Sequence, residues 1–140
     1  MKKIMLCVLV IVMFSSLVYG DGKTCELKLN VYDRLKIIGL LPQKANFEKA
    51  MLISDIKAKL NLTQTDIVLY EIKTEGDSIK WNAEGTERRD FVFTEIELQV
   101  IKDSFQEMNS KNEVEATPSF LELYKKVKNA EGGQSEKVDK

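Results

Sequence analysis

An uncharged run near the N-terminus decides which part of this 140-residue chain is left to fold. Lys2 and Lys3 form a short positive start, and Ile4–Gly20 follows without a charged residue. A basic start, an apolar run and a small residue at its end are typical of a secretory signal peptide. We therefore predict that residues 1–20 are cleaved and that a secreted or periplasmic mature chain begins at Asp21.

The same run leaves one alternative for localisation, an N-terminal membrane anchor that is never removed. Ile4–Gly20 lies at the lower edge of the roughly 17–25 apolar residues that span a bilayer. No basic stop-transfer cluster follows it. Cleavage is therefore the favoured interpretation, and after cleavage we expect no stable membrane insertion.

Composition then narrows the chemistry of the mature chain. Removing residues 1–20 removes Lys2 and Lys3 and no acid, so 19 basic residues face 22 acidic ones. This mildly acidic balance predicts no binding of nucleic acid. The sequence has no histidine, which excludes histidine-dependent catalytic and metal sites. Cys25 is the single cysteine left after cleavage, so no disulfide can form within the mature chain.

Residues 21–26 are polar, and we expect them to be frayed. Cys25 lies in this stretch and is interpreted as an incidental thiol. The alternative is a disulfide between two chains in an oxidising compartment.

Helix signals dominate the rest of the mature chain. Helices are predicted over Val31–Leu41 and, after an N-cap at Asn46, over Phe47–Leu60. Thr63 and Thr94 each begin an S/T-x-x-acid capping box, which predicts a short third helix and a long fourth one. The third helix carries Ile67, Val68 and Tyr70, although a strand over Ile67–Ile72 fits the same residues. A last helix begins at Thr117-Pro118, and four of its residues are expected to face the core: Phe120, Leu121, Tyr124 and Val127.

Strand signals are fewer and shorter. Apolar residues alternate with polar ones over Ile72–Trp81, and Gly76-Asp77 predicts the tight turn of a hairpin. Phe91–Phe93 is a further strand candidate, expected beside that hairpin. The predicted fold class is α+β, mainly α, with four to five short helices and an inserted antiparallel hairpin or three-stranded sheet. A single domain is expected over residues 21–129, followed by a disordered tail over 130–140.

The order of these elements resembles that of a known group of proteins. The resemblance rests on Arg34–Pro42, on Trp81-Asn82, on Phe93–Glu97 and on Leu121–Lys126. It points to a loose group of small uncharacterised proteins of tailed bacteriophages and their bacterial hosts. The shared residues are hydrophobic and capping residues, so the resemblance implies a fold and no activity or site residue. The export leader sets this chain apart from that group.

Two constellations of side chains invite a functional interpretation. The hairpin and the fourth helix carry several acids, which are interpreted as solvated: Glu71, Glu75, Asp77, Glu95, Glu97 and Asp103. Acid–base or calcium chemistry would require them to converge in a cleft. Arg88 and Arg89 beside Trp81 could form a recognition surface, although a lone Trp is typically a packing residue of a hairpin.

The sequence therefore predicts no catalytic, cofactor-binding or metal-binding residues. It favours an exported, non-enzymatic interaction or accessory module that works with an unidentified protein partner. The first alternative is a carboxylate- or metal-dependent enzyme without a recognisable motif. The second is a winged-helix-like DNA-binding domain, but the third helix, Thr63–Tyr70, contains no Lys or Arg to meet a phosphate backbone.

Cleavage of the leader is directly testable by mass spectrometry. The intact mass of protein recovered from the periplasm or medium of an expressing cell should correspond to a chain beginning at Asp21. A mass that begins at Met1 would contradict the signal peptide and favour the retained anchor.

Overall fold

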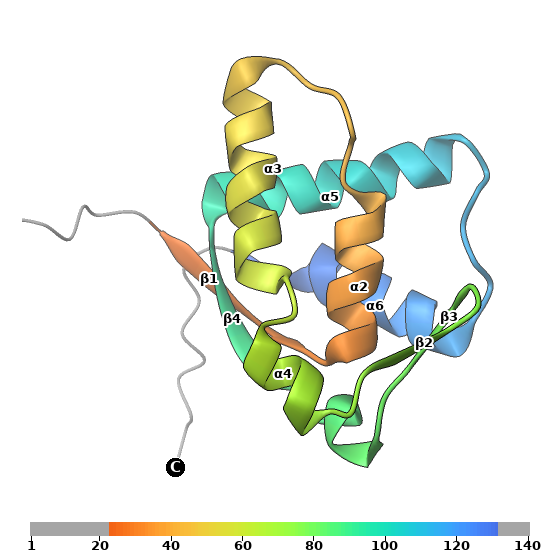
Figure 1. Cartoon of the computed structure of the whole chain (residues 1–140). Coiled ribbons are helices and arrows are strands. Elements are labelled where there is room, and N and C mark those ends of the chain that lie inside the picture. Colours follow the sequence, from red (N-terminus) through yellow and green to blue (C-terminus); the bar gives the residue numbers. More distant parts are fainter. Residues whose placement is uncertain (1–22, 132–140) are drawn as a thin grey trace, which may run out of the picture.

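The computed structural model describes residues 23–131, and this part of the chain folds as a mainly helical α+β domain (Figure 1). The elements follow in the order β1 (Thr24–Leu29), α2 (Val31–Leu40), α3 (Phe47–Leu60), α4 (Gln64–Leu69), β2 (Lys73–Glu75), β3 (Ser78–Lys80), the 3-10 helix η2 (Ala83–Thr86), β4 (Arg89–Thr94), α5 (Glu95–Ser110) and α6 (Pro118–Asn129). The predicted fold class is confirmed. The predicted leader over 1–20 and most of the predicted tail over 130–140 lie outside the described residues.

The helices begin where their capping residues predict. The Asn46 side chain accepts a hydrogen bond from the backbone N–H of Lys49 at the start of α3. At α5, the N–H of Glu97 donates to Thr94 Oγ1 at 3.2 Å, and the N–H of Thr94 donates to Glu97 Oε2 at 2.8 Å. These bonds satisfy backbone groups that a helix start otherwise leaves without partners.

A two-stranded antiparallel ribbon of β1 and β4 forms the centre of the domain. Cys25 pairs with Phe93 and Leu27 with Phe91, so one face of the ribbon is apolar. The expected fraying is wrong for residues 24–26, because β1 begins at Thr24 and Cys25 is buried, while residues 21 and 22 lie outside the described residues. Exposed Thr24, Glu26 and Lys28 alternate with the buried residues of β1, which is the pattern of a ribbon with one covered face.

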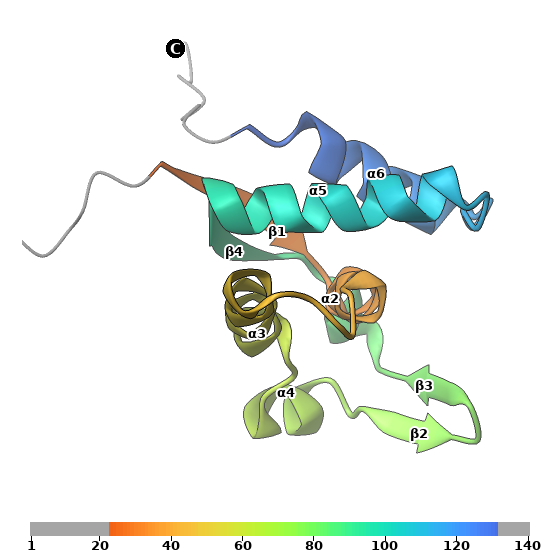
Figure 2. The same cartoon turned by 90° about the horizontal axis from the view of Figure 1, so that it is seen from above.

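The strand Phe91–Phe93 was expected beside the hairpin, and this placement is wrong. β4 pairs with β1, whereas β2 and β3 pair only with each other. The three-stranded alternative is therefore replaced, in the described part of the chain, by two separate two-stranded sheets. Figure 2 shows the hairpin at the far side of α2, away from the ribbon. Alternation in a sequence identifies a strand but contains no information about its partner.

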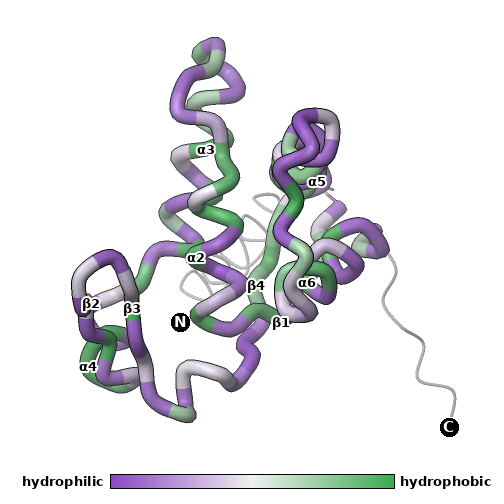
Figure 3. Tube along the Cα trace, turned by 90° about the vertical axis from the view of Figure 1, so that its right-hand side faces the viewer, coloured by the Kyte–Doolittle hydropathy of each residue, from purple (hydrophilic) through white to green (hydrophobic). Residues whose placement is uncertain are grey.

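Two pairs of helices pack against the ribbon. Figures 2 and 3 show α5 and α6 on one side of β1 and β4, and α2 and α3 on the other. The most deeply buried side chains come from all of these elements: Leu29, Ile37, Ile56, Leu60, Phe93, Ile101, Phe120 and Leu123. None of the helices in the described residues combines the length and apolar character needed to cross a bilayer.

The inward face of α6 differs from the prediction at one position. Phe120, Tyr124 and Val127 pack into or against the core as expected. Leu121 is 40% exposed, and Leu123 is fully buried instead. Leu121 lies about 100° around the helix from Phe120, whereas residues three and four apart share a face.

A buried guanidinium joins four elements of the fold. Arg34 on α2 donates from Nε to the carbonyl of Leu60 at 2.9 Å and from Nη2 to the carbonyl of Asn61 at 2.7 Å. Its Nη2 also lies 3.0 Å from Asp66 Oδ2, and its guanidinium stacks 5.0 Å from the ring centroid of Phe91. Arg34 therefore satisfies the C-terminal carbonyls of α3 and holds α4 and β4 against α2.

Asp66 completes this network, and its ionisation is tied to folding. Burial opposes its charge, but the backbone N–H of Thr63 and the Arg34 guanidinium outweigh burial and lower the pKa of Asp66. A carboxyl whose pKa is lowered by folding contributes stability above its unfolded pKa, about 3.9 for Asp. That contribution is lost as the pH falls through the lower, folded value.

We therefore expect Asp66→Asn to lower the free energy of unfolding by about 3–5 kcal/mol at neutral pH, because it leaves Arg34 charged and buried. Its denaturant midpoint should also depend less on pH below about pH 4 than that of the wild type. Asp55→Asn is the matched control, since Asp55 is exposed on α3 and should change stability by less than about 0.5 kcal/mol. Equal effects of the two substitutions would contradict this role of Asp66.

Candidate functional site

A concave, mainly apolar surface that combines several elements is a cleft of about 550 Å³ beside α2. Figure 1 shows the hairpin and the connection between α5 and α6 on the same side of the molecule, and Figure 2 shows that they lie apart in depth. The apolar lining comes from α2, from β3 and the residue after it, and from α5 and α6: Tyr32, Leu35, Gly39, Leu40, Ile79, Trp81, Met108 and Phe120. An apolar and aromatic lining with few polar groups is typical of ligand and peptide sites.

Trp81 is held in this wall by the end of the hairpin. The backbone N–H of the next residue, Asn82, donates to the carbonyl of Tyr70 at 2.8 Å, and its side chain donates to the carbonyl of Leu69 at 3.0 Å. Gly85 packs directly against the indole, since a methyl group there would lie 2.6 Å from Trp81 Cδ1. Backbone hydrogen bonds and a close glycine contact therefore fix the ring from two sides.

Three charged side chains line the cleft. Lys36 Nζ lies 2.5 Å from Glu115 Oε1 and 5.7 Å from the ring centroid of Tyr32. Both members of this ion pair are partly exposed, so their attraction is screened and contributes little to stability. Asp77, in the hairpin turn, also lines the cleft and forms no ion pair within the described residues. Asp77 is therefore a carboxylate at the rim that is available to a ligand.

The two arginines predicted to share a surface with Trp81 point to different neighbours. Arg88 lines a second hollow of about 250 Å³ together with Trp81 and forms an ion pair with Glu122 on α6. Arg89 instead stacks over the ring of Tyr70 at 5.0 Å and lies 3.4 Å from Asp66. Adjacent residues of an extended strand point to opposite faces, which separates the pair.

The six acids singled out in the sequence are dispersed. Glu97 is buried, caps α5 and lies 2.6 Å from Lys59 Nζ. Glu75 pairs with Lys80 across the hairpin, and Asp103 accepts a hydrogen bond from Gln99. Glu71 and Glu95 are exposed, and Asp77 lines the cleft. Residues 23–131 contain no group of three or more acids or cysteines placed to hold a metal ion.

Cys25 lies in the core rather than in a flexible segment. Its side chain packs in the hydrophobic cluster of the ribbon and is 6% exposed. Burial raises the pKa of the thiol, with Lys102 opposing and Glu26 reinforcing the shift. A buried, protonated thiol is a poor nucleophile for exchange, which weighs against the disulfide between chains.

α4, the third helix, has a structural role rather than the features of a recognition helix. It spans Gln64–Leu69 and exposes Ile67 and Val68, while its acid Asp66 is buried against Arg34. No basic residue of its own faces solvent.

Several cleft residues carried no signal in the sequence. Tyr32, Met108 and Gly39 each fit the pattern of a helix, and nothing in their spacing separates a core position from the wall of a cleft. Trp81 was singled out because it is the single Trp of the chain. Comparison with protein-family models, with curated proteins and with solved structures found no match to this chain. The resemblance to phage-associated proteins stays a prediction.

Contact between Gly85 and the indole can be tested by adding one methyl group. Gly85→Ala should displace Trp81, shift its fluorescence emission and lower the free energy of unfolding by about 1–3 kcal/mol, because the site is already filled. Gly39→Ala is the matched control, since a methyl group there has no atom within 4 Å. It should leave the emission unchanged and raise stability by about 0.5–1 kcal/mol. An unchanged emission in Gly85→Ala would contradict the packing of Trp81.

Proposed function

We propose that this chain is an exported, non-enzymatic interaction module that binds a short segment of a partner protein in the cleft between α2 and the hairpin. The observation that carries the proposal is the wall formed by Tyr32, Ile79 and Trp81, which places two aromatic rings and an aliphatic side chain around one hollow. Aromatic side chains that are already fixed in place lose little entropy when a partner binds.

The buried ionisable groups support a binding role over acid–base chemistry. Arg34 and Asp66 join elements of the fold, and Glu97 caps α5 while it pairs with Lys59. Asp33 likewise caps α2 and pairs with Lys126 of α6 at 3.0 Å. Each of these charges has a structural partner, so the buried charges lie where they stabilise the fold and not at the cleft.

The lining of the cleft also indicates the chemistry of the partner. An aliphatic or aromatic side chain would be buried against Trp81 and Met108. Asp77 at the rim of the cleft favours a basic residue next to that apolar one. Glu115, which also contacts Lys36, adds a second carboxylate on the cleft. We therefore propose a segment in which an apolar side chain is flanked by Lys or Arg.

Trp81 provides the test, because it is the single Trp of the chain and lines the cleft. The mature chain is titrated with a peptide that has a central leucine flanked by lysines, and Trp fluorescence is recorded. We expect a saturable change in emission. A peptide with glutamates in place of the lysines should bind about three- to fivefold more weakly, since a screened ion pair contributes up to about 1 kcal/mol.

Ile79→Asp should abolish the change, because it places a charge in the apolar wall. Val92→Asp is the matched control: Val92 is an exposed aliphatic residue on β4, away from the cleft, and its substitution should leave binding intact. Equal behaviour of the two variants, or no response to the lysine peptide, would overturn the proposal. A change in emission on adding duplex DNA that weakens with salt would favour the DNA-binding alternative instead.

A further inference from the structure

The outward face of α3 carries a stripe of two large apolar and two small side chains that nothing in the described residues covers. Phe47, Met51, Ser54 and Ala58 follow one another at spacings of four, three and four residues. Residues at these spacings lie on one side of a helix, and the pattern is that of a helix–helix seam. Phe47 is 91% exposed and Met51 is 69% exposed. Neither is accounted for by the packing of the domain.

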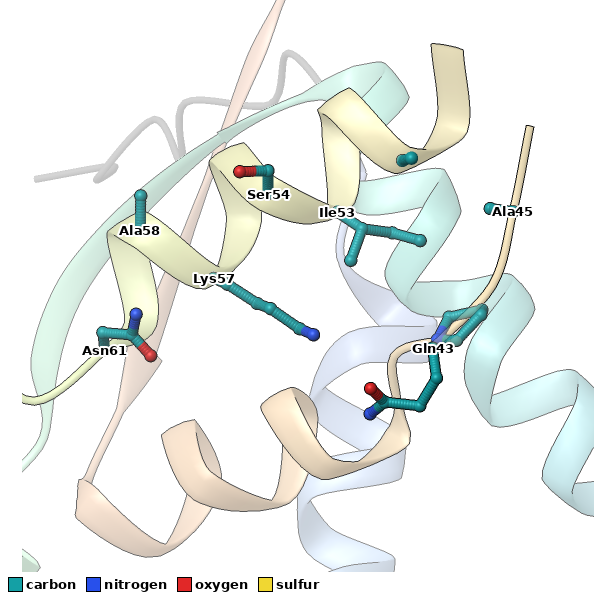
Figure 4. Close-up of a pocket in the computed structure, with 9 residues that line it drawn as sticks. Gln43, Ala45, Ile53, Ser54, Lys57, Ala58 and Asn61 are labelled. Atoms are coloured by element: carbon teal, nitrogen blue, oxygen red, sulfur yellow. The ribbon is translucent and has the colours of Figure 1, made fainter. Parts of the chain in front are cut away.

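The stripe is accessible, and its side chains are large at the N-terminal end of α3 and small at the C-terminal end. The N-terminal half of α3, with Phe47 and Met51, projects beyond α5 (Figures 1 and 3). The C-terminal half has only the small side chains of Ser54 and Ala58 on the same face. A groove of about 480 Å³ runs beside this small half, between α3 and the chain that follows α2 (Figure 4).

We infer that the stripe is the interface of a homodimer in which the α3 helices of two copies pack antiparallel. In that arrangement Phe47 of each copy lies opposite Ala58 of the second copy, and Met51 lies opposite Ser54. Both pairings share one centre, between residues 52 and 53, so a single twofold axis generates them. A parallel pair would place the two Phe47 rings against each other and leave a gap between the small halves.

The area available suits a small, reversible interface. Burying a Phe side chain removes about 150–250 Å² from water. The two copies of Phe47 therefore supply about a third to a half of the roughly 1,000 Å² that a specific interface needs. The two Met51 side chains and the groove walls would add to this area. A dimer of this size forms in a concentration-dependent manner.

Charges beside the stripe distinguish the two helix directions. Glu48 and Asp55 lie on one flank of the stripe, and Lys57 lies on the other. None of the three forms an ion pair within residues 23–131. An antiparallel pair brings Glu48 next to Asp55 of the second copy, whereas a parallel pair brings the acidic flank next to the flank with Lys57. Repulsion between the acids makes the antiparallel dimer weaker at low salt.

An exchange of side chains tests the pairing. Sedimentation velocity of the mature chain over a range of concentrations should show a monomer–dimer equilibrium. Phe47→Ala should weaken dimerisation at least tenfold by removing the large side chain, and Ala58→Phe should weaken it by placing Phe against Phe. The double variant should restore dimerisation, because each large side chain again meets a small one. All three changes are at exposed positions, so circular dichroism and the thermal midpoint should confirm the fold.

Asp55→Lys tests the direction of the helices. In the antiparallel dimer it replaces a repulsive contact with Glu48 by an attractive one, so the dissociation constant should fall several-fold at low salt. In a parallel dimer the same change would weaken association, because it adds charge beside Lys57. A mature chain that stays monomeric at all concentrations would overturn the inference and leave the stripe to another partner. Failure of the double variant to recover would overturn the register.

Discussion

The hydrogen bonds of Arg34 are the interaction on which the arrangement of this domain depends. One guanidinium satisfies the last carbonyls of α3, pairs with Asp66 at the start of α4 and stacks on Phe91 of β4. An apolar side chain in its place would leave carbonyl groups at the end of α3 without donors in the interior. The charge is tolerated there because each of its neighbours is an acceptor or a ring face. No buried side-chain polar atom of the described residues lacks a partner.

Positions far apart in the sequence meet on the two sides of this network. The ribbon of β1 and β4 joins the beginning of the domain to its last third, and α5 and α6 cover it (Figure 2). On the other side, α4 and the hairpin follow α3 and bring Trp81 to the same cleft as Tyr32 of α2. The cleft and the core are therefore both formed where segments far apart in the sequence come together. A change that loosens α4 alters the position of the hairpin as well.

Local signals in the sequence were informative wherever a side chain acts on its own backbone. Asn46, Thr63, Thr94 and Thr117 begin helices because their oxygens accept hydrogen bonds from N–H groups three residues ahead. These contacts depend only on nearby residues, so they are visible in one dimension. The partner of β4 and the burial of Cys25 depend on distant residues, and both predictions were therefore wrong.

The sequence by itself determined where most helices begin, the position of the hairpin turn and the absence of histidine chemistry, because these follow from residue types and their local spacing. Only the tertiary structure decided which surfaces are open. α3 shows this most clearly: Ile56 and Phe47 are both apolar, yet Ile56 is fully buried and Phe47 is almost fully exposed. The sequence of α3 places large apolar residues on two opposite sides of the helix. Which stripe is covered depends on where β1, β4 and α5 lie, and long-range packing sets those positions.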